Sequence, residues 1–352
     1  MTHMKPLSPA LCANAKWAFT TRRVNRTDVR GLSTSFATAK PGDLILCEIA
    51  EIGHHKKIQL AERRVSVSYP GDLVVLCLGD RYAPDQFLAS AVIDDDLIDL
   101  VAGGGVAGRV DVSHIAMDDP TRLKPLGLLT GAQGQVLNIA SYALPATAPN
   151  HAVTVIGVFG ASMNSGKTTA ASSLAHGLLR AGYNVAGVKA TGTGAFGDFN
   201  SFEDGGAPAL DFTDVGMATT YRMPLARIED GFDTLVATAA ARGAEVVVVE
   251  IADGVFQQET RAILRSSKIR DRLDGILFAA PDALSALGGE TVLNSMNLGS
   301  FAISGMVSCS PLAAAEAAEV TGLPILTRED LWSPATIAEH VAPLMRTATV
   351  AA

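Results

Sequence analysis

The order of apolar and polar positions divides the chain into two parts with different periodicities. From about residue 17 to 142, short apolar runs are separated by turns that contain glycine. Runs of this length between turn residues predict the strands of a small mainly-β domain, either a barrel or a sandwich. One pattern occurs twice, because Pro41–Cys47 (PGDLILC) and Pro70–Cys77 (PGDLVVLC) both place a Pro-Gly-Asp turn before an apolar strand.

After residue 150 the pattern changes to strands that alternate with helices. Val153–Gly160 is apolar throughout, and 168–182 has helical spacing and ends on glycine. Further strands are predicted at 185–190, 246–252, 275–280, 303–309 and 324–327, and helices at 230–242, 257–267, 283–297, 312–320 and 334–345. Strands that are apolar on both faces are typical of a parallel sheet covered by helices. We therefore predict a mainly-β binding or oligomerisation domain over 1–145 and a doubly wound α/β nucleotide-binding domain over 151–352.

A strand, a glycine-rich loop and a helix follow one another at the start of the second part. The loop reads Gly160-Ala-Ser-Met-Asn-Ser-Gly-Lys-Thr-Thr169. This arrangement binds phosphate, because glycines let backbone N–H groups face the anion and the helix N-terminus adds its dipole. Lys167 supplies positive charge to the terminal phosphates, and Thr168 offers a hydroxyl to Mg²⁺. The predicted nucleotide-binding residues are Gly160, Ser162, Asn164, Ser165, Gly166, Lys167, Thr168 and Thr169.

The spacing of this P-loop points to a particular group of proteins. Five residues separate Gly160 from Gly166, one more than in the common pattern. The loop resembles that of dethiobiotin synthetase and the related cobyrinate amidase synthetases. Tyr183–Ala190 is similar to the dethiobiotin synthetase strand that ends in a lysine near the reacting phosphate. The resemblance covers about residues 153–327, and it implies ATP as the nucleotide and Lys189 as a second cation at the active site.

Carboxylates are also required, because magnesium beside a triphosphate usually takes an acidic ligand in addition to the loop hydroxyl. Glu250 ends an apolar strand, and the tip of a parallel strand faces the crevice where ligands bind. The matching strand of dethiobiotin synthetase also ends in Glu. An aspartate that holds magnesium in that family favours Asp214 over Asp211, although both could simply cap a helix predicted at 215–221. The resulting predictions are catalytic Lys167, Lys189 and Glu250, and metal ligands Thr168, Asp214 and Glu250.

Three polar segments have no assigned chemistry. Arg22, Arg23, Arg26 and Arg30 form one basic cluster, and His54–Lys57 forms a second. Each is either a solvated turn or a patch for a phosphate, a carboxylate or a nucleic acid. The acidic, glycine-rich segment 191–214 is either a surface excursion or a wall of the active site.

Composition narrows the class of protein. The 352 residues are 48% hydrophobic, and their charged fraction of 18% is low, which favours tightly packed layers over a disordered chain. The net charge of −8 makes nucleic acid an unlikely partner. Because no apolar run approaches the roughly 20 residues that span a bilayer, we predict no membrane segment and a cytoplasmic location. Cys12, Cys47, Cys77 and Cys309 lack the CxxC spacing of metal sites and are predicted to be buried, reduced thiols.

These features lead to one main functional hypothesis and two alternatives. The main hypothesis is a Mg²⁺-ATP-dependent phosphoryl-transfer enzyme, a kinase or carboxylate-activating ligase, that acts on a small molecule as a homo-oligomer, a dimer. The first alternative is a nucleotide-driven switch or cofactor-insertion accessory protein that docks a protein partner. The second is a coenzyme A-dependent acyltransferase whose P-loop holds the coenzyme phosphates. The absence of an Asn/Thr-Lys-x-Asp guanine signature disfavours a conventional GTPase.

Overall fold

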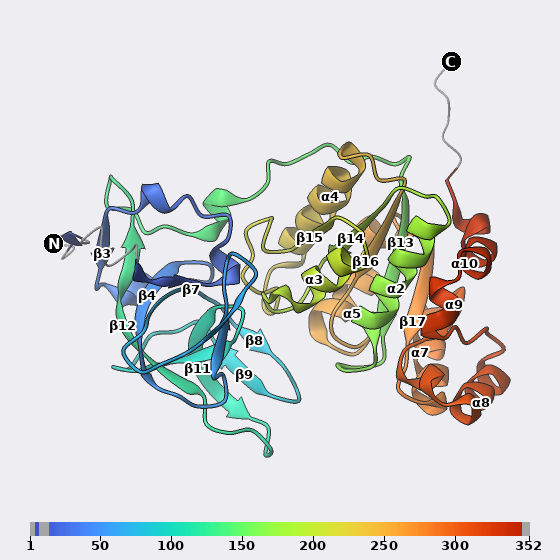
Figure 1. Ribbon diagram of the computed structural model, residues 1–352, viewed down its shortest axis with the longest axis horizontal. Helices are drawn as coiled ribbons and strands as arrows, with labels where there is room; N and C mark the ends of the chain where they lie inside the picture. The colour runs from blue at the N-terminus through green and yellow to red at the C-terminus, as the bar shows by residue number, and fades with distance from the viewer. Residues whose placement is uncertain (1–3, 7–13, 347–352) are drawn as a thin grey trace. The chain divides into compact units, whose positions relative to one another are not determined.

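The computed structural model describes residues 4–6 and 14–346, which form two compact units (Figure 1). The first unit comprises Met1–Leu144, Thr193–Phe196 and Phe212–Arg222. The second comprises Pro145–Gly192, Gly197–Asp211 and the chain from Met223 onwards. The first segment ends one residue before the predicted domain limit of 145. The two later segments of the first unit fall inside the range 151–352, and the linear pattern did not reveal them.

The first unit consists of short strands joined by turns and 3₁₀ helices. The strands are β1 (Met4–Pro6), β2 (Lys16–Trp17), β3 (Gly31–Ser33), β4 (Leu44–Glu51), β5 (Lys57–Gln59), β6 (Val65–Val67), β7 (Leu73–Leu78), β8 (Arg81–Tyr82), β9 (Phe87–Ser90), β10 (Ile98–Ala102), β11 (Val106–Ser113) and β12 (Thr121–Thr130). Strands β4, β7, β11, β10 and β12 pair in turn, and β12 pairs again with β4. These pairings close a barrel, one of the two mainly-β forms predicted.

The repeated sequence pattern builds two adjacent strands of this barrel. Strands β4 and β7 run antiparallel, with Leu44 opposite Cys77 and Cys47 opposite Val74. The turn glycines Gly42 and Gly71 adopt φ of 85° and 88°, a left-handed conformation that glycine adopts without steric cost. Alternate side chains of both strands pack into two different apolar clusters, which explains why both strands are apolar without interruption.

The second unit is a six-stranded sheet covered by helices. Its strands are β13 (Thr154–Gly160), β14 (Val185–Lys189), β15 (Ala209–Asp211), β16 (Val246–Glu250), β17 (Gly275–Ala279) and β18 (Ala302–Ser304). They lie in the order β15-β14-β16-β13-β17-β18, and each neighbouring pair is parallel. The doubly wound α/β fold predicted from sequence is therefore present.

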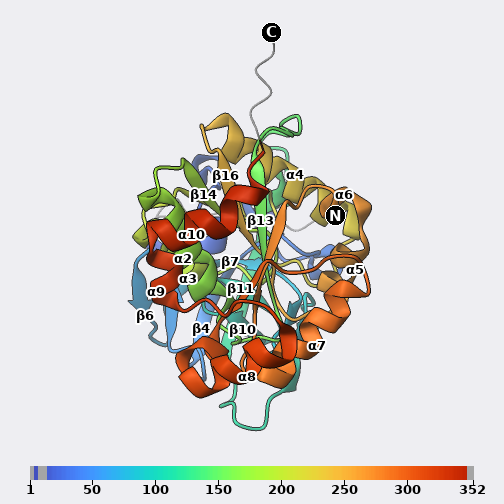
Figure 2. The ribbon, with the colours of Figure 1, turned by 90° about the vertical axis from the view of Figure 1, so that its right-hand side faces the viewer.

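Helices cover both faces of this sheet. They are α2 (Lys167–Arg180), α3 (Phe196–Asp204), α4 (Leu225–Ala241), α5 (Gln258–Arg265), α6 (Ser267–Arg270), α7 (Ala283–Asn294), α8 (Pro311–Thr321), α9 (Arg328–Trp332) and α10 (Pro334–Val341). Figure 2 shows α2, α9 and α10 on one side of β13, and α4, α5 and α7 on the other. The core on the α2 side joins Leu174 and Leu178 of this helix to Ile156 of β13 and Leu331 of α9.

Several predicted elements differ from the structure. The helix predicted at 215–221 is a series of turns within a segment of the first unit. The strand predicted at 324–327 is reduced to one bridge between Ile303 and Ile325. The strand predicted at 303–309 stops at Ser304 and continues as a 3₁₀ helix.

The cysteines follow the prediction only in part. Cys47 and Cys77 are buried free thiols in the barrel, and burial raises the pKa of both, to about 12 for Cys77. Cys309 is exposed, because it lies in the 3₁₀ helix rather than in a buried strand. Cys12 lies outside the described residues. Between residues 14 and 346, no helix has the length and apolar character needed to cross a bilayer.

Candidate phosphate and metal site

The glycine-rich loop has the local geometry that its sequence predicts. Strand β13 is buried along its length and ends at Gly160, and α2 begins at Lys167. A Cβ added to Gly160 would lie 2.5 Å from Ser165 Oγ, and one added to Gly166 would lie 2.8 Å from the Gly305 Cα. Gly166 also has φ of 97°, which favours glycine. Both glycines are therefore required by the tight path of the loop.

The second unit is a P-loop domain. Its loop joins a central strand to the N-terminus of α2, where unpaired backbone N–H groups and the helix dipole favour an anion. Lys167 is only 7% exposed, and its Nζ donates to the Ser162 carbonyl oxygen at 2.7 Å. Burial lowers the Lys167 pKa to about 8, although the Glu250 carboxylate partly offsets this effect. An ammonium group has three donors, so phosphate oxygens can take up those that remain.

Two predicted residues meet because their strands are neighbours. Lys189 and Glu250 end β14 and β16, and they are directly paired in the parallel register. Lys189 Nζ lies 2.5 Å from Glu250 Oε1 and 2.8 Å from Asp198 Oδ2. Thr168 Oγ1 lies 2.8 Å from Asp198 Oδ1 and 3.0 Å from Glu250 Oε1. The loop hydroxyl and both carboxylates therefore converge with Lys189 at one point.

Electrostatics favour the charged forms of Lys189 and Asp198 in this cluster. Burial by itself would lower the pKa of Lys189, but the Asp198 and Glu250 carboxylates outweigh it and raise this pKa. Burial would raise the Asp198 pKa, and Lys189 reverses the shift and lowers it. Burial raises the Glu250 pKa, with partial compensation from Lys189. The ammonium of Lys189 is thus fixed in place by the two carboxylates that flank it.

The side chains present suit a divalent cation. Thr168 has one hydroxyl hydrogen, so it can donate to only one of its two carboxylate neighbours at a time. Glu250 Oε2 is buried and has no hydrogen-bond partner, which is costly for a carboxylate oxygen. Hydroxyl and carboxylate oxygens are the ligands that Mg²⁺ prefers. Thr168, Asp198 and Glu250 therefore form a donor set that fits this ion.

The structure puts Asp198, rather than Asp214, in this cluster. Asp214 belongs to the first unit, where its Oδ2 lies 2.8 Å from Arg22 Nη2. The Arg22 guanidinium also stacks over the Phe19 ring, 4.1 Å from the ring centre. Part of the basic cluster predicted near residue 22 is thus an internal ion pair. Asp214, which we predicted as a metal ligand, instead forms an ion pair within the first unit.

Sequence reasoning missed Asp198 because it lies in the glycine-rich segment that we interpreted as irregular. A helical signal is nevertheless present there. Phe196, Phe199 and Phe202 are spaced three residues apart, and Phe196 and Phe202 are buried in the structure. This spacing is typical of one face of a helix, and it corresponds to α3, which carries Asp198 in its first turn. The three phenylalanines are the signal that could have identified it.

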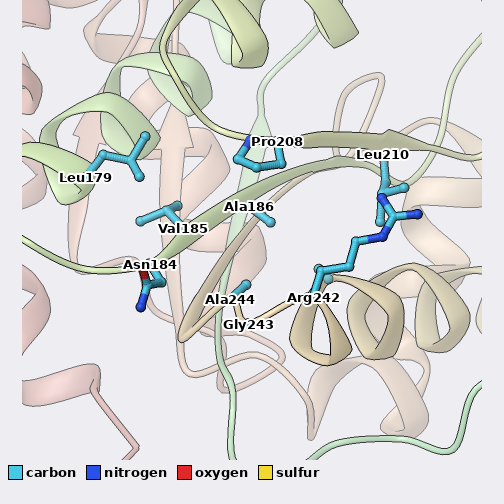
Figure 3. A pocket seen from close by; sticks show the side chains of 10 residues that line it. Leu179, Asn184, Val185, Ala186, Pro208, Leu210, Arg242, Gly243 and Ala244 are labelled. Carbon is cyan, nitrogen blue, oxygen red and sulfur yellow. The ribbon is translucent and has the colours of Figure 1, made fainter.

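A separate cavity of about 180 Å³ lies at the opposite end of β14 (Figure 3). Val185 and Ala186, which begin this strand, contribute to its wall, whereas Lys189 ends the strand. The cavity is therefore not part of the phosphate site. Its remaining lining residues are Leu179, Asn184, Pro208, Leu210, Ala239, Arg242, Gly243 and Ala244.

Comparisons with known proteins give limited information about this site. No family model matches the chain, and no curated protein matches it. A solved structure of the signal recognition particle receptor FtsY from Elizabethkingia anophelis, in complex with GDP, is 16% identical with a TM-score of 0.38. The match covers 53% of this chain and 63% of that one, so it spans less than two thirds of the FtsY chain. FtsY from Mycoplasma mycoides is 13% identical, with a TM-score of 0.37 and coverage of 57% and 69%. The resemblance to dethiobiotin synthetase stays a hypothesis.

Proposed function

We propose that the chain binds a magnesium–nucleoside triphosphate and transfers its terminal phosphoryl group to a small-molecule acceptor. The observation that carries this proposal is the convergence of Thr168, Asp198 and Glu250 beside Lys189, at the mouth of a P-loop. A phosphate cradle alone would suit many anions. A hydroxyl and two carboxylates at the same point add a site for the metal that accompanies a triphosphate.

Each side chain has a distinct role in this proposal. Thr168, Asp198 and Glu250 would hold the Mg²⁺, which supplies positive charge to the phosphate oxygens. Lys167 and Lys189 would stabilise negative charge on the transferring phosphoryl group, a major contribution in this class of reaction. The ion pairs of Lys189 keep its charge in a fixed position before the nucleotide arrives. Fixed charges are favourable because they need no rearrangement during the reaction.

The dethiobiotin synthetase-like resemblance favours ATP and a kinase or ligase that acts on a small metabolite. We retain ATP as the proposed nucleotide, with GTP as the direct comparison in the same binding assay. A homodimer and a cytoplasmic location are further proposals from the sequence.

A nucleotide-driven switch with a protein partner is the second candidate, and the path of the chain favours it. Along the chain, the segment Thr193–Phe196 of the first unit comes after Lys189 and before Asp198. The segment Phe212–Arg222 of the same unit follows directly after β15. The backbone therefore connects the phosphate site to the barrel unit at two strand ends. A nucleotide-driven switch has to transmit a change at the phosphates to the surface that docks its partner, and these backbone connections offer such a path. A phosphoryl-transfer enzyme does not require one.

One comparison separates the two candidates. Turnover of ATP and GTP would be measured with Mg²⁺, first alone and then with a panel of carboxylate, amine and alcohol metabolites. A phosphoryl-transfer enzyme requires a metabolite for full turnover and yields a phosphorylated or condensed product. A switch shows the same low turnover with every metabolite. Tight coenzyme A binding without magnesium-dependent nucleotide binding would contradict both candidates and favour the acyltransferase alternative.

The two aspartates provide a matched test of the metal site. Asp198→Asn should raise the Mg²⁺ concentration for half-maximal turnover by about tenfold or more, because a neutral amide is a weaker ligand for a hard cation. Asp214→Asn should leave this requirement unchanged and lower the free energy of unfolding instead, because it weakens the pair with Arg22. Magnesium titrations and urea unfolding of both variants would measure the two effects. If Asp214→Asn raised the Mg²⁺ requirement and Asp198→Asn did not, Asp214 would be the metal ligand instead.

A further inference from the structure

The chain that follows β16 returns to the phosphate cradle. The segment 251–257 leads from β16 to α5, and both elements belong to the second unit. The Val255 N–H donates to the Gly160 carbonyl oxygen at 3.1 Å. A Cβ added to Gly254 would lie 2.3 Å from the Ala161 carbonyl oxygen, so only glycine lets the two backbones approach this closely. The segment is therefore packed directly on the P-loop.

The beginning of the same segment is held by two threonine side chains. The Ala252 N–H donates to Thr191 Oγ1 at 2.9 Å, and Thr191 Oγ1 in turn donates to the Ala252 carbonyl oxygen at 3.0 Å. Thr260 Oγ1 of α5 donates to this carbonyl oxygen as well, at 2.5 Å. Both threonines are buried. Asp253 therefore lies between one backbone unit fixed by these threonines and another fixed by the P-loop, and its place is set from both sides.

The Asp253 carboxylate acts on the lysine of the P-loop. Burial lowers the pKa of Lys167, and the carboxylates of Glu250 and Asp253 work in the opposite direction. Lys167 is the residue that reaches the terminal phosphates in a P-loop. Asp253 is thus a further carboxylate beside the reacting phosphate, in addition to Asp198 and Glu250, which contact Thr168.

An aromatic ring is exposed in the same segment. Phe256 is 75% exposed, whereas its neighbour Val255 is buried. Exposed apolar residues are common and by themselves need no explanation. This one lies three residues after Asp253, in a turn closed by the Gln257 N–H, which donates to the Gly254 carbonyl oxygen at 3.0 Å. The fixed backbone therefore offers an apolar surface next to a carboxylate, at the edge of the phosphate site.

We propose that the segment 253–256 is the acceptor subsite and that the acceptor is an alcohol with an apolar or aromatic body. Asp253 binds and deprotonates the hydroxyl group, and the Phe256 ring covers the apolar body. This inference rests on the proposed phosphoryl transfer and narrows its acceptor. A carboxylate acceptor is disfavoured, because the charge of Asp253 repels a second anion at this place. Neither the P-loop motif nor the resemblance to dethiobiotin synthetase assigns these two residues.

The proposed step uses Asp253 as a general base. The hydroxyl oxygen of the acceptor forms a bond to the terminal phosphorus of ATP, and its proton passes to the Asp253 carboxylate. The bond between that phosphorus and the bridging oxygen breaks, and ADP leaves with the bonding electron pair. The Asp253 carboxyl then releases the proton to water. A positioned base typically contributes a factor of about 100 to 10,000 to the rate.

The test uses matched probes and variants of the full chain. Benzyl alcohol carries a hydroxyl and a ring, benzoate replaces the hydroxyl by a carboxylate, and ethanol lacks the ring. Binding would be measured by ligand-observed NMR with Mg²⁺ and a non-hydrolysable ATP analogue, and transfer with ATP itself. The variants are Asp253→Asn and Phe256→Ala. Asp204→Asn at the end of α3 and Val320→Ala in α8 change exposed residues as controls.

We expect the wild type to bind benzyl alcohol at least about tenfold more tightly than benzoate or ethanol. Phe256→Ala should weaken benzyl alcohol binding by about tenfold and leave ethanol binding unchanged, because the ring contact is lost. Asp253→Asn should slow transfer to benzyl alcohol by about 100-fold, because an amide cannot accept the proton. ATP affinity should not fall in either variant, since neither side chain donates to the phosphates. Both control variants should resemble the wild type.

Several results would overturn the inference. Transfer to benzoate but not to benzyl alcohol would do so and would leave the proposed phosphoryl transfer intact. Absence of binding or of transfer with benzyl alcohol, an unchanged rate in Asp253→Asn, or unchanged binding in Phe256→Ala would do so too. A fall in ATP affinity would place the altered side chain in the nucleotide site instead. A wild-type protein without magnesium-dependent ATP binding would refute the proposed function itself, and that failure is visible before any probe is added.

Discussion

Replacement of Lys167 by alanine should lower the affinity for a nucleoside triphosphate by about 100-fold or more. Hydrogen bonds from a charged donor to phosphate are strong, and a loss of about 2.8 kcal/mol corresponds to this factor. The fold should tolerate the change. Burial lowers the Lys167 pKa to about 8, so the charged side chain is poorly stabilised until an anion arrives. The Lys167 ammonium donates a hydrogen bond to the Ser162 carbonyl oxygen.

Binding of a fluorescent nucleotide analogue and urea unfolding would test both parts of this prediction. Lys268→Ala is a suitable control, because it removes a lysine whose ion pairs with Asp230 and Asp233 lie on the surface. That variant should bind nucleotide normally. If Lys167→Ala retained wild-type affinity in a protein that binds nucleotide, the P-loop would not be the binding site and the proposed function would fail.

Replacement of Lys189 by methionine should be damaging in two separate ways. Turnover should fall by about 100- to 1000-fold, as when one preorganised charge donor is removed from an active site. The free energy of unfolding should fall by roughly 3 kcal/mol, because loss of one partner leaves buried charge without compensation. The uncompensated charges are those of Glu250, which is 1% exposed, and of the partly exposed Asp198.

A double substitution separates the two effects. Lys189→Met combined with Glu250→Gln removes both members of the closest pair, so most of the lost stability should return. Activity should not return, because the second cation and one metal ligand are both absent. Chemical unfolding and single-turnover phosphoryl transfer would measure the two quantities. Stability that stayed low in the double variant would show that Lys189 supports the fold mainly through Asp198 or through packing.

The local pattern of the sequence determined much of this fold. The strand, loop and helix around Gly160 depend on glycines and apolar spacing within about twenty residues, and near neighbours along the chain decide such features. Lys189 and Glu250 could also be predicted, because parallel strands bring their carboxyl ends to one edge of the sheet. The short apolar runs between turns similarly predicted a mainly-β unit, although not which strands would pair.

Only the tertiary structure decided which acidic residue joined these two. Asp198 and Asp214 lie in the same irregular segment, and both are aspartates near predicted helix starts. Asp198 is carried to Thr168 and Lys189 by α3, whereas Asp214 is paired with Arg22 of the first unit. Both outcomes depend on partners that lie outside the segment carrying the two aspartates. Periodicity and turn chemistry act over a few residues, so the sequence alone determined the phosphate cradle, and long-range packing determined the carboxylate that completes it.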